Sequence, residues 1–350
     1  MTEITGSNAT AGLKVATTFG TAATLTTGDK MVFESLTPTY GGEVLQANPL
    51  GSGDIMTQVA QKGAFSPTTT IERNLGYADP GWAATAQLFG GASIGTITSG
   101  YSHSIMMNEI MNQRYLTLGC QLQASSIMEH ASAVCTSVKL SASNPPSYIK
   151  QTITLLAEDL KTTGTTNSFG NINALTASDS ELVVFDPTSE FRINTQSGGA
   201  LAASDRINIT GFEVEYNRPQ QHAREAKGSA GNTAPIATND VPFSCTLTVT
   251  FRSMGDLQTQ FLTAYGATTE YKASIINTGT VLAGANSKEI NLNFPRLKIV
   301  EGPDFAVANA GNNEFTVKFM ALVASSNPTG MIDVYPNIIM KNNRTPAWSA

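Results

Sequence analysis

Two segments of the chain follow the same pattern, and this internal repeat limits the possible folds more than any other feature. Residues 65–90 (FSPTTTIERNLGYADPGWAATAQLFG) and residues 243–266 (FSCTLTVTFRSMGDLQTQFLTAYG) both begin with Phe-Ser and continue through a run that contains several threonines. Each segment then passes through a short turn, continues with helical spacing of apolar residues and ends at glycine. A repeated unit of this kind predicts a duplicated domain in which each copy contains the same elements.

Alternating side chains predict the strands of both copies. In residues 243–252 the apolar side chains occupy every second position and threonines fill the positions between them, where β-branched residues favour an extended backbone. The predicted inward-facing residues are Cys245, Leu247, Val249 and Phe251. Three further pairs of segments extend the repeat: residues 31–40 with 207–216, residues 115–125 with 288–299, and residues 148–160 with 312–325. We expect Pro295 to interrupt the strand in which it lies.

Apolar spacing and end signals predict one short helix in each copy. In the first copy, Trp82 and Phe89 lie on one helical face, Asp79 and Pro80 form the start, and Gly90 forms the stop. The corresponding residues of the second copy are Leu257, Phe261, Tyr265 and the closing Gly266. A helix of about three turns is not stable alone, so each should pack against a sheet.

The repeat divides the chain into five parts. We expect an N-terminal arm, a first β domain, a linker, a second β domain and a C-terminal arm, which span residues 1–30, 31–160, 161–204, 205–326 and 327–350. Each domain carries a long loop at the same place, residues 39–64 and residues 217–241. Loops of more than about 20 residues are uncommon inside compact domains and are usually functional or disordered. Because both copies keep one, we expect a shared use, such as reaching a neighbouring subunit.

Charged residues are sparse in this chain. They make up 14% of it, whereas roughly 25% is usual for a soluble domain, and apolar residues make up 41%. A surface with few charges loses little hydration when it is buried, which favours contact between copies, although a monomer covered in Ser, Thr, Asn and Gly has the same composition. The net charge of −6 disfavours binding to DNA phosphates and suits a surface past which DNA slides without sticking.

The sequence contains no pattern that predicts catalysis or the binding of a metal or cofactor. Cys120, His130 and Cys135 could supply three metal ligands, but a fourth is missing, so we expect buried, reduced thiols. The histidines lie outside the known hydrolase and metalloprotease motifs, and no glycine run forms a phosphate loop. We therefore expect no enzyme activity, no cofactor and no metal. The first residues predict no signal peptide, and no apolar run is long enough to predict a membrane span.

Several short motifs occur in the order in which a known family of proteins has them. They are residues 17–22 (TTFGTA), residues 63–65 (GAF), residues 119–122 (GCQL), residues 137–142 (SVKLSA) and residues 293–297 (NFPRL). With the internal duplication, these motifs make the chain resemble the duplicated tail tube proteins of siphophages over residues 15–325. Residues 217–241 match none of the motifs.

The resemblance implies a mainly β fold of two tandem tail-tube-type β-sandwich or half-barrel domains, each flanked by one short α-helix. It also implies that three chains, carrying six domains, close into a ring, and that rings stack into a tube which conducts DNA from capsid to tail tip. The partners would be further copies of the chain and the tail-tip and tail-terminator proteins, with no membrane involved. DNA would pass through the lumen without specific binding, and the protein would lie in the tail of a virion assembled in the host cytoplasm.

Residues with expected roles in such a tube come from two places. Glu213 and Glu215 are the candidates for the lumen, because they alternate with the apolar face of residues 207–216. The candidates for contacts between subunits or rings lie in the charged loop and are Arg218, His222, Arg224, Glu225 and Lys227. The alternative is another self-assembling virion protein, such as a capsid decoration or minor capsid protein.

Overall fold

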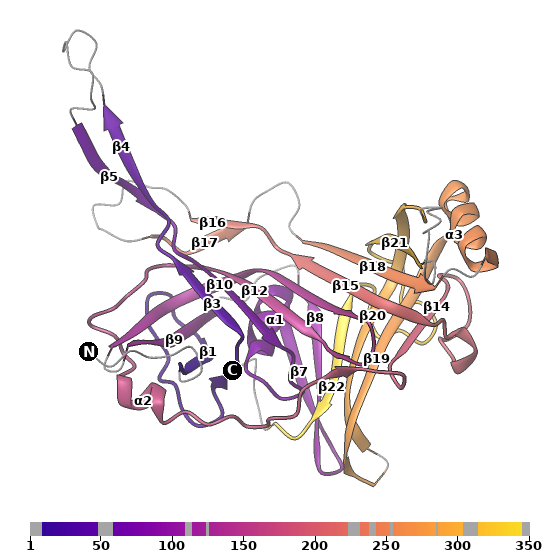
Figure 1. Ribbon diagram of the computed structural model, residues 1–350, viewed down its shortest axis with the longest axis horizontal. Helices are drawn as coiled ribbons and strands as arrows, with labels where there is room; N and C mark the ends of the chain where they lie inside the picture. Colours follow the sequence, from indigo (N-terminus) through magenta and orange to yellow (C-terminus); the bar gives the residue numbers. More distant parts are fainter. Residues whose placement is uncertain are drawn as a thin grey trace.

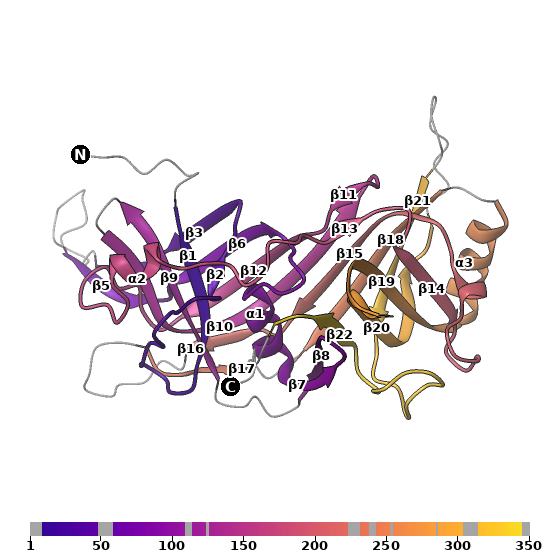
Figure 2. The same cartoon turned by 90° about the horizontal axis from the view of Figure 1, so that it is seen from below.

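A computed structural model shows an elongated β protein (Figures 1 and 2). It describes residues 9–47, 59–108, 114–123, 126–222, 232–237, 243–252, 255–284, 286–303 and 314–344. Most of these residues form antiparallel strands, so the expectation of a mainly β fold is confirmed. Helix α2 (Phe169–Asn173) lies at one end of the molecule, α1 (Gly81–Phe89) in the middle and α3 (Gly255–Ala267) at the other end.

The strands from the N-terminal part of the chain pair in the order β3-β6-β12-β10-β9-β1-β2. Their bounds are β1 (Ala11–Ala16), β2 (Lys30–Met31), β3 (Ser35–Thr39), β6 (Thr68–Asn74), β9 (Tyr115–Gln123), β10 (Ser126–Ser143) and β12 (Lys150–Ala157). Because β10 has 18 residues, its first part pairs with β9 and its later part with β12. We call this set of strands, together with α1, the first copy.

The strands from the C-terminal part repeat this order as β15-β18-β21-β20-β19-β14. Their bounds are β14 (Glu190–Thr195), β15 (Ile209–Asn217), β18 (Ser244–Arg252), β19 (Glu270–Ala283), β20 (Asn286–Glu301) and β21 (Glu314–Ala321). In this second copy, α3 joins β18 to β19, at the place where α1 follows β6 in the first copy. The topology therefore contains the same arrangement of six strands and one helix twice.

Strand register confirms most of the residue matches expected from the sequence. Leu36 pairs with Ile71 as Phe212 pairs with Val249. Likewise, Thr68 pairs with Leu156 as Thr246 pairs with Met320. These pairs match residues 31–40 with 207–216, residues 65–74 with 243–252, and residues 148–160 with 312–325.

The expected match of residues 115–125 with 288–299 is wrong by one strand. The register between β10 and β12 shifts between Cys135 and Ser137, and the register between β20 and β21 shifts between Ile299 and Glu301. The equivalent of β20 is therefore β10, and β9 corresponds to β19. Both strands of each hairpin alternate in the same way, so alternation alone did not distinguish them. Pro295 does not end β20 either, because it lies at a bulge in which Pro295 and Arg296 of β20 lie opposite the single residue Lys272 of β19.

The two copies are joined through β10 and β15, which pair in antiparallel register from Ser137 and Asn217 to Ser143 and Gly211. This pairing makes the strands β3-β6-β12-β10-β15-β18-β21 one continuous sheet. A second connection runs from β20 through β22 (Asn337–Asn342) to β8 (Gly100–Met107) and β7 (Gly90–Ile97). The second copy is therefore connected to the N-terminal half of the chain twice, once through β15 and once through β20.

Helix α1 is enclosed by the rest of the chain. All nine of its residues are buried, and it contacts β1, β7, β8, β9 and β10. Asp79 accepts a hydrogen bond from the backbone N–H of Gly81 at 2.7 Å, while Pro80 takes the N-cap position expected for Asp79. Gly90 closes the helix with a φ of 85°, as expected. Helix α3 instead continues through Gly266, the residue at which we expected it to stop.

The expected arms and linker contain strands of the sheets. β1 lies in residues 1–30, β14 in the linker and β22 in the C-terminal arm, and all three pair with strands of the two copies. The linker also contains β13 (Val184–Phe185), which pairs with β11 (Ser147–Tyr148), and a short 3-10 helix (Ala203–Asp205). The strands β1, β14 and β22 carry too weak an alternation for sequence analysis to find them.

Each long loop contains a hairpin. β4 (Gly42–Ala47) pairs with β5 (Val59–Phe65) in the first copy, and this hairpin projects far from the body (Figure 1). β16 (Gln220–His222) pairs with β17 (Pro235–Ala237) in the second copy. The two loops lie at equivalent places in the repeat, between β3 and β6 and between β15 and β18.

Candidate functional site

The continuous sheet has one apolar face and one polar face. On β15, Phe212, Val214 and Tyr216 are buried, whereas Glu213 and Glu215 are half-buried on the opposite face. The neighbouring strands alternate in the same phase, because their registers place Thr248 and Ser141 beside Glu213. The polar face therefore runs without interruption from β3 in the first copy to β21 in the second.

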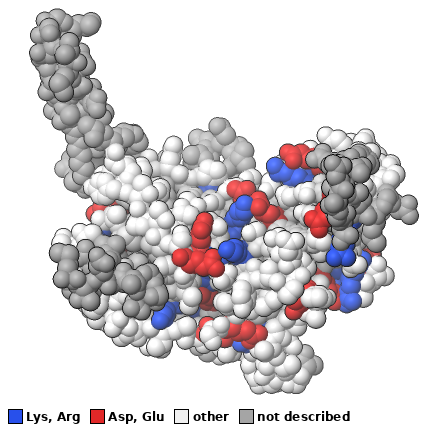
Figure 3. All heavy atoms as spheres, viewed as in Figure 1, with Lys and Arg blue, Asp and Glu red and all other residues white. Residues whose placement is uncertain are grey.

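The polar face carries mostly Ser and Thr, and its charges are nearly balanced. Its acidic residues are Glu34, Glu72, Glu213, Glu215 and Glu314, and its basic residues are Lys139, Lys150, Arg252 and Lys318. Lys139 lies 2.6 Å from the Glu213 carboxylate, and Glu215 accepts a hydrogen bond from Asn217 at 2.9 Å. In Figure 3, which shows one face of the molecule, charges are sparse and opposite signs often lie close together. Such a face has little attraction for phosphate groups.

The structure places Glu213 and Glu215 on the polar face, in the phase expected from the sequence. Sequence analysis did not find the local partners Lys139 and Asn217, which belong to a neighbouring strand and to the same strand. The charge of Glu213 is thus largely offset on the surface itself.

The candidates Arg218 and His222 are buried inside the chain, which corrects their assignment to contacts between subunits. The Arg218 guanidinium donates to the carbonyl oxygens of Leu88 at 3.1 Å and Asn108 at 3.3 Å, and its burial lowers its pKa. The ring nitrogens of His222 lie 2.9 Å from the Ala157 carbonyl oxygen and 3.0 Å from that of Thr233. The second loop therefore packs against the first copy of the same chain. Arg224, Glu225 and Lys227 lie outside the described residues.

Three aromatic rings pack together where the two copies meet. Phe89, the last residue of α1, approaches Tyr216 and Phe243 edge-on, with ring centroids 5.0 and 5.3 Å apart. Tyr216 and Phe243 lie 6.3 Å apart. We call these three rings and the paired strands β10 and β15 the joint. Sequence analysis missed the joint, although each ring lies in one of the matched segments and has an aromatic residue at its equivalent position.

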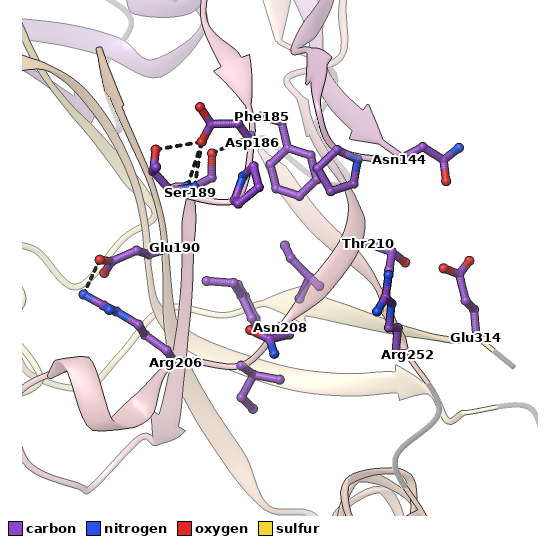
Figure 4. A pocket seen from close by; sticks show the side chains of 16 residues that line it. Asn144, Phe185, Asp186, Ser189, Glu190, Arg206, Asn208, Thr210, Arg252 and Glu314 are labelled. Atoms are coloured by element: carbon purple, nitrogen blue, oxygen red, sulfur yellow. Dashed lines mark hydrogen bonds and ion pairs between the residues drawn. The ribbon is translucent and has the colours of Figure 1, made fainter. Parts of the chain in front are cut away.

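A hollow beside β10 and β15 has a volume of about 840 Å³ and is open to solvent (Figure 4). Asn144, the turn around Asp186 and the start of β15 contribute to its wall. Asp186 accepts hydrogen bonds from the backbone and hydroxyl of Thr188, at 2.8 and 2.7 Å, and Glu190 forms an ion pair with Arg206. Turn contacts and an ion pair at the rim account for these groups, so the hollow offers no arrangement typical of an active site.

Burial favours the neutral form of the three thiols and of two of the histidines. Cys120, Cys135 and Cys245 are buried and free of disulfides, and desolvation raises the pKa of Cys120 to about 11. Burial also lowers the pKa values of His103 and His130, which favours the neutral rings. Within the described residues, no three His, Cys, Asp or Glu side chains gather as a metal site. No helix in that part of the chain has the length and apolar character needed to cross a membrane.

Comparison of the chain with models of known protein families and with curated proteins found no match. The repeat, the joint and the polar face are therefore the features of the molecule that bear on its function.

Proposed function

We propose that this chain is a structural virion protein whose copies form rings that stack into a phage tail tube, the conduit for DNA ejection. The observation that carries the proposal is the β10–β15 pairing, which joins the equivalent sheets of two copies edge to edge. Repeating the same step between chains extends the sheet from copy to copy. A contact of this head-to-tail kind gives a closed ring when its rotation divides a full turn evenly. Three chains with six copies form the proposed ring.

The polar face supports its use as the wall of a DNA channel. A duplex carries one negative charge about every 1.7 Å along its axis, so a basic wall would hold it through counterion release. This face is rich in hydroxyl groups and carries five acidic and four basic residues, so it has no excess of positive charge. We place this face, with Glu213 and Glu215, on the lumen side, where DNA passes without specific binding.

The β4–β5 hairpin supports stacking of rings. It extends away from the body, and among the described residues β4 and β5 pair only with each other (Figure 1). We place the β4–β5 hairpin against the next ring of the tube, where it would contact a neighbouring copy of the chain. The remaining partners in the proposal are the tail-tip and tail-terminator proteins, which close the two ends of the tube.

Negative-stain electron microscopy of the purified, concentrated protein tests the proposal. We expect rings or hollow tubes with a central channel, and three chains in each ring by native mass spectrometry. Closed shells would instead favour the capsid decoration or minor capsid alternative. A protein that stays monomeric at its highest soluble concentration would contradict both functions.

A further inference from the structure

Each part of the joint has an equivalent elsewhere in the chain, and the equivalents lie apart. Phe89 ends α1 directly before Gly90, as Tyr265 lies directly before Gly266 in α3. Phe243 directly precedes β18, and its equivalent Phe65 lies at the corresponding place before β6. The remaining pair is Tyr216 and Tyr40, because Glu215 pairs with Thr246 as Thr39 pairs with Thr68. All three positions are therefore aromatic in both copies.

These equivalent aromatic residues differ sharply from those of the joint in their exposure. Phe89 and Tyr216 are 0% exposed, whereas Tyr265 is 49% and Tyr40 is 44% exposed. Tyr40 stacks on Phe65 with ring centroids 5.4 Å apart, which keeps together the pair that corresponds to Tyr216 and Phe243. A large aromatic ring half in water loses the stabilisation that burial would give it.

The two groups lie in different parts of the molecule, so one chain cannot bring them together as the joint does. Tyr265 belongs to α3 at one end, whereas Tyr40 follows β3 in the other half of the molecule (Figures 1 and 2). Each chain therefore carries the equivalent of Phe89 at one place and the equivalents of Tyr216 and Phe243 at another. A second copy of this chain can supply the missing half at both.

The strand edges beside these residues match in the same way. β15 pairs on one edge with β18 and on the other with β10, whereas its equivalent β3 pairs only with β6 among the described strands. An unpaired edge is a template for another strand. Glu301 of β20 is the equivalent of Ser137, the residue at which β10 begins to pair with β15.

We propose that Tyr265 of one chain packs against Tyr40 and Phe65 of the next, as Phe89 packs against Tyr216 and Phe243 within the chain. The partner is another copy of this protein, bound head to tail, with the outer edge of β3 facing the end of β20. The inference rests on the ring assembly proposed above and names the surfaces that form its contacts.

Two single variants, Tyr265→Asp and Tyr40→Asp, test the inference in the full chain. Each replaces a ring of the contact with a charge, so each variant alone should lose ring assembly, with half-assembly shifted at least about tenfold in concentration. A mixture of the two should form dimers and go no further. The intact Tyr265 of one variant still meets the intact Tyr40 of the other, and both remaining ends are blocked. Sedimentation velocity distinguishes monomers, dimers and rings.

Tyr148→Asp is the matched control, because Tyr148 is 52% exposed and lies on β11, away from both groups. We expect it to assemble like the wild type, and circular dichroism confirms the fold of every variant. Rings that persist in both single variants, or a mixture that stays monomeric, would overturn the contact without affecting the tube function. Head-to-tail dimers in the mixture combined with wild-type assemblies that lack a channel would support the contact and overturn the tube. A wild type that never associates would overturn both.

Discussion

At the scale of single residues, the clearest structural role belongs to the buried ion pair between Arg73 and Asp79. Both side chains are nearly inaccessible to water, and the same carboxylate accepts a hydrogen bond from Gly81 at the start of α1. Asp79 therefore does two things: it balances the charge of Arg73 and satisfies a free backbone N–H of the helix. Because α1 lies beside the joint, this residue links local stability to the contact between copies.

We predict that Asp79→Ala lowers the free energy of unfolding by about 3–5 kcal/mol, because it leaves the Arg73 guanidinium buried without a counter-charge. Urea unfolding monitored by circular dichroism measures the change. The control is Lys150→Ala, which breaks an exposed pair with Glu34 at 3.2 Å and should cost less than about 1 kcal/mol. Equal losses of unfolding free energy in the two variants would show that the buried pair stabilises the fold no more than the exposed pair does.

Four of the candidate residues show which side-chain positions can be predicted from the sequence and which cannot. Glu213 and Glu215 were placed on the correct face, because period-two alternation depends only on the strand that carries them. Arg218 and His222 were placed wrongly, because their partners Leu88, Asn108 and Ala157 lie far away in the chain. Sequence analysis predicts that a charged loop is exposed, because it cannot identify the distant carbonyl groups that accept hydrogen bonds from the loop's side chains.

At the scale of elements, the two equivalent loops have different environments. The β16–β17 hairpin is held to the first copy by His222 and by Asn232, whose side chain donates to the Glu158 carbonyl oxygen at 2.9 Å. The β4–β5 hairpin projects from the body (Figure 1). Deletion of the second loop should therefore weaken the fold itself.

We predict that replacing residues 43–64 with a short Gly-Ser turn leaves rings intact and shortens the tubes. Gly42 and Phe65 lie opposite each other in the hairpin, so a tight turn can connect them without moving β3 or β6. Tube lengths in electron micrographs measure the effect, and the urea midpoint controls for stability. Tubes of wild-type length would contradict a role for this hairpin in stacking.

The elements that sequence analysis found are those with a strong local pattern. β15, β18 and β21 alternate cleanly and were matched residue by residue with β3, β6 and β12. β1, β14 and β22 were missed, because a short strand is stabilised by its neighbours more than by its own composition. For the same reason β9 was matched with β20, where only pairing partners separate the correct strand from its neighbour.

At the scale of the whole molecule, the balance of charge on the polar face matters more than any single group on it. Acidic and basic side chains alternate among hydroxyl groups over seven strands drawn from both copies. If this face lines the lumen, an excess of positive charge on it would be repeated in every copy along the tube. DNA would then meet many weak contacts at once.

We predict that tubes of the Glu213→Lys/Glu215→Lys double variant retain duplex DNA, and that rising salt concentration releases it. Sedimentation of tubes with labelled DNA measures the retention. The control is Glu213→Gln/Glu215→Gln, which removes the acidic groups without adding positive charge and should retain little. Assembled Lys-variant tubes that bind no more DNA than the wild type would place this face away from the channel.

The joint within the chain has a consequence for the kinetics of assembly. Its two halves are tethered by the linker, so they meet at a high effective concentration that does not depend on the amount of protein. In the proposed ring, every second contact is therefore already formed when the chain has folded, and only the contacts between chains respond to dilution. The two kinds of contact are also free to diverge. Arg218 strengthens the internal one, whereas the equivalent residue of the other is Gly42, which leaves the contact between chains as the step at which assembly can be controlled.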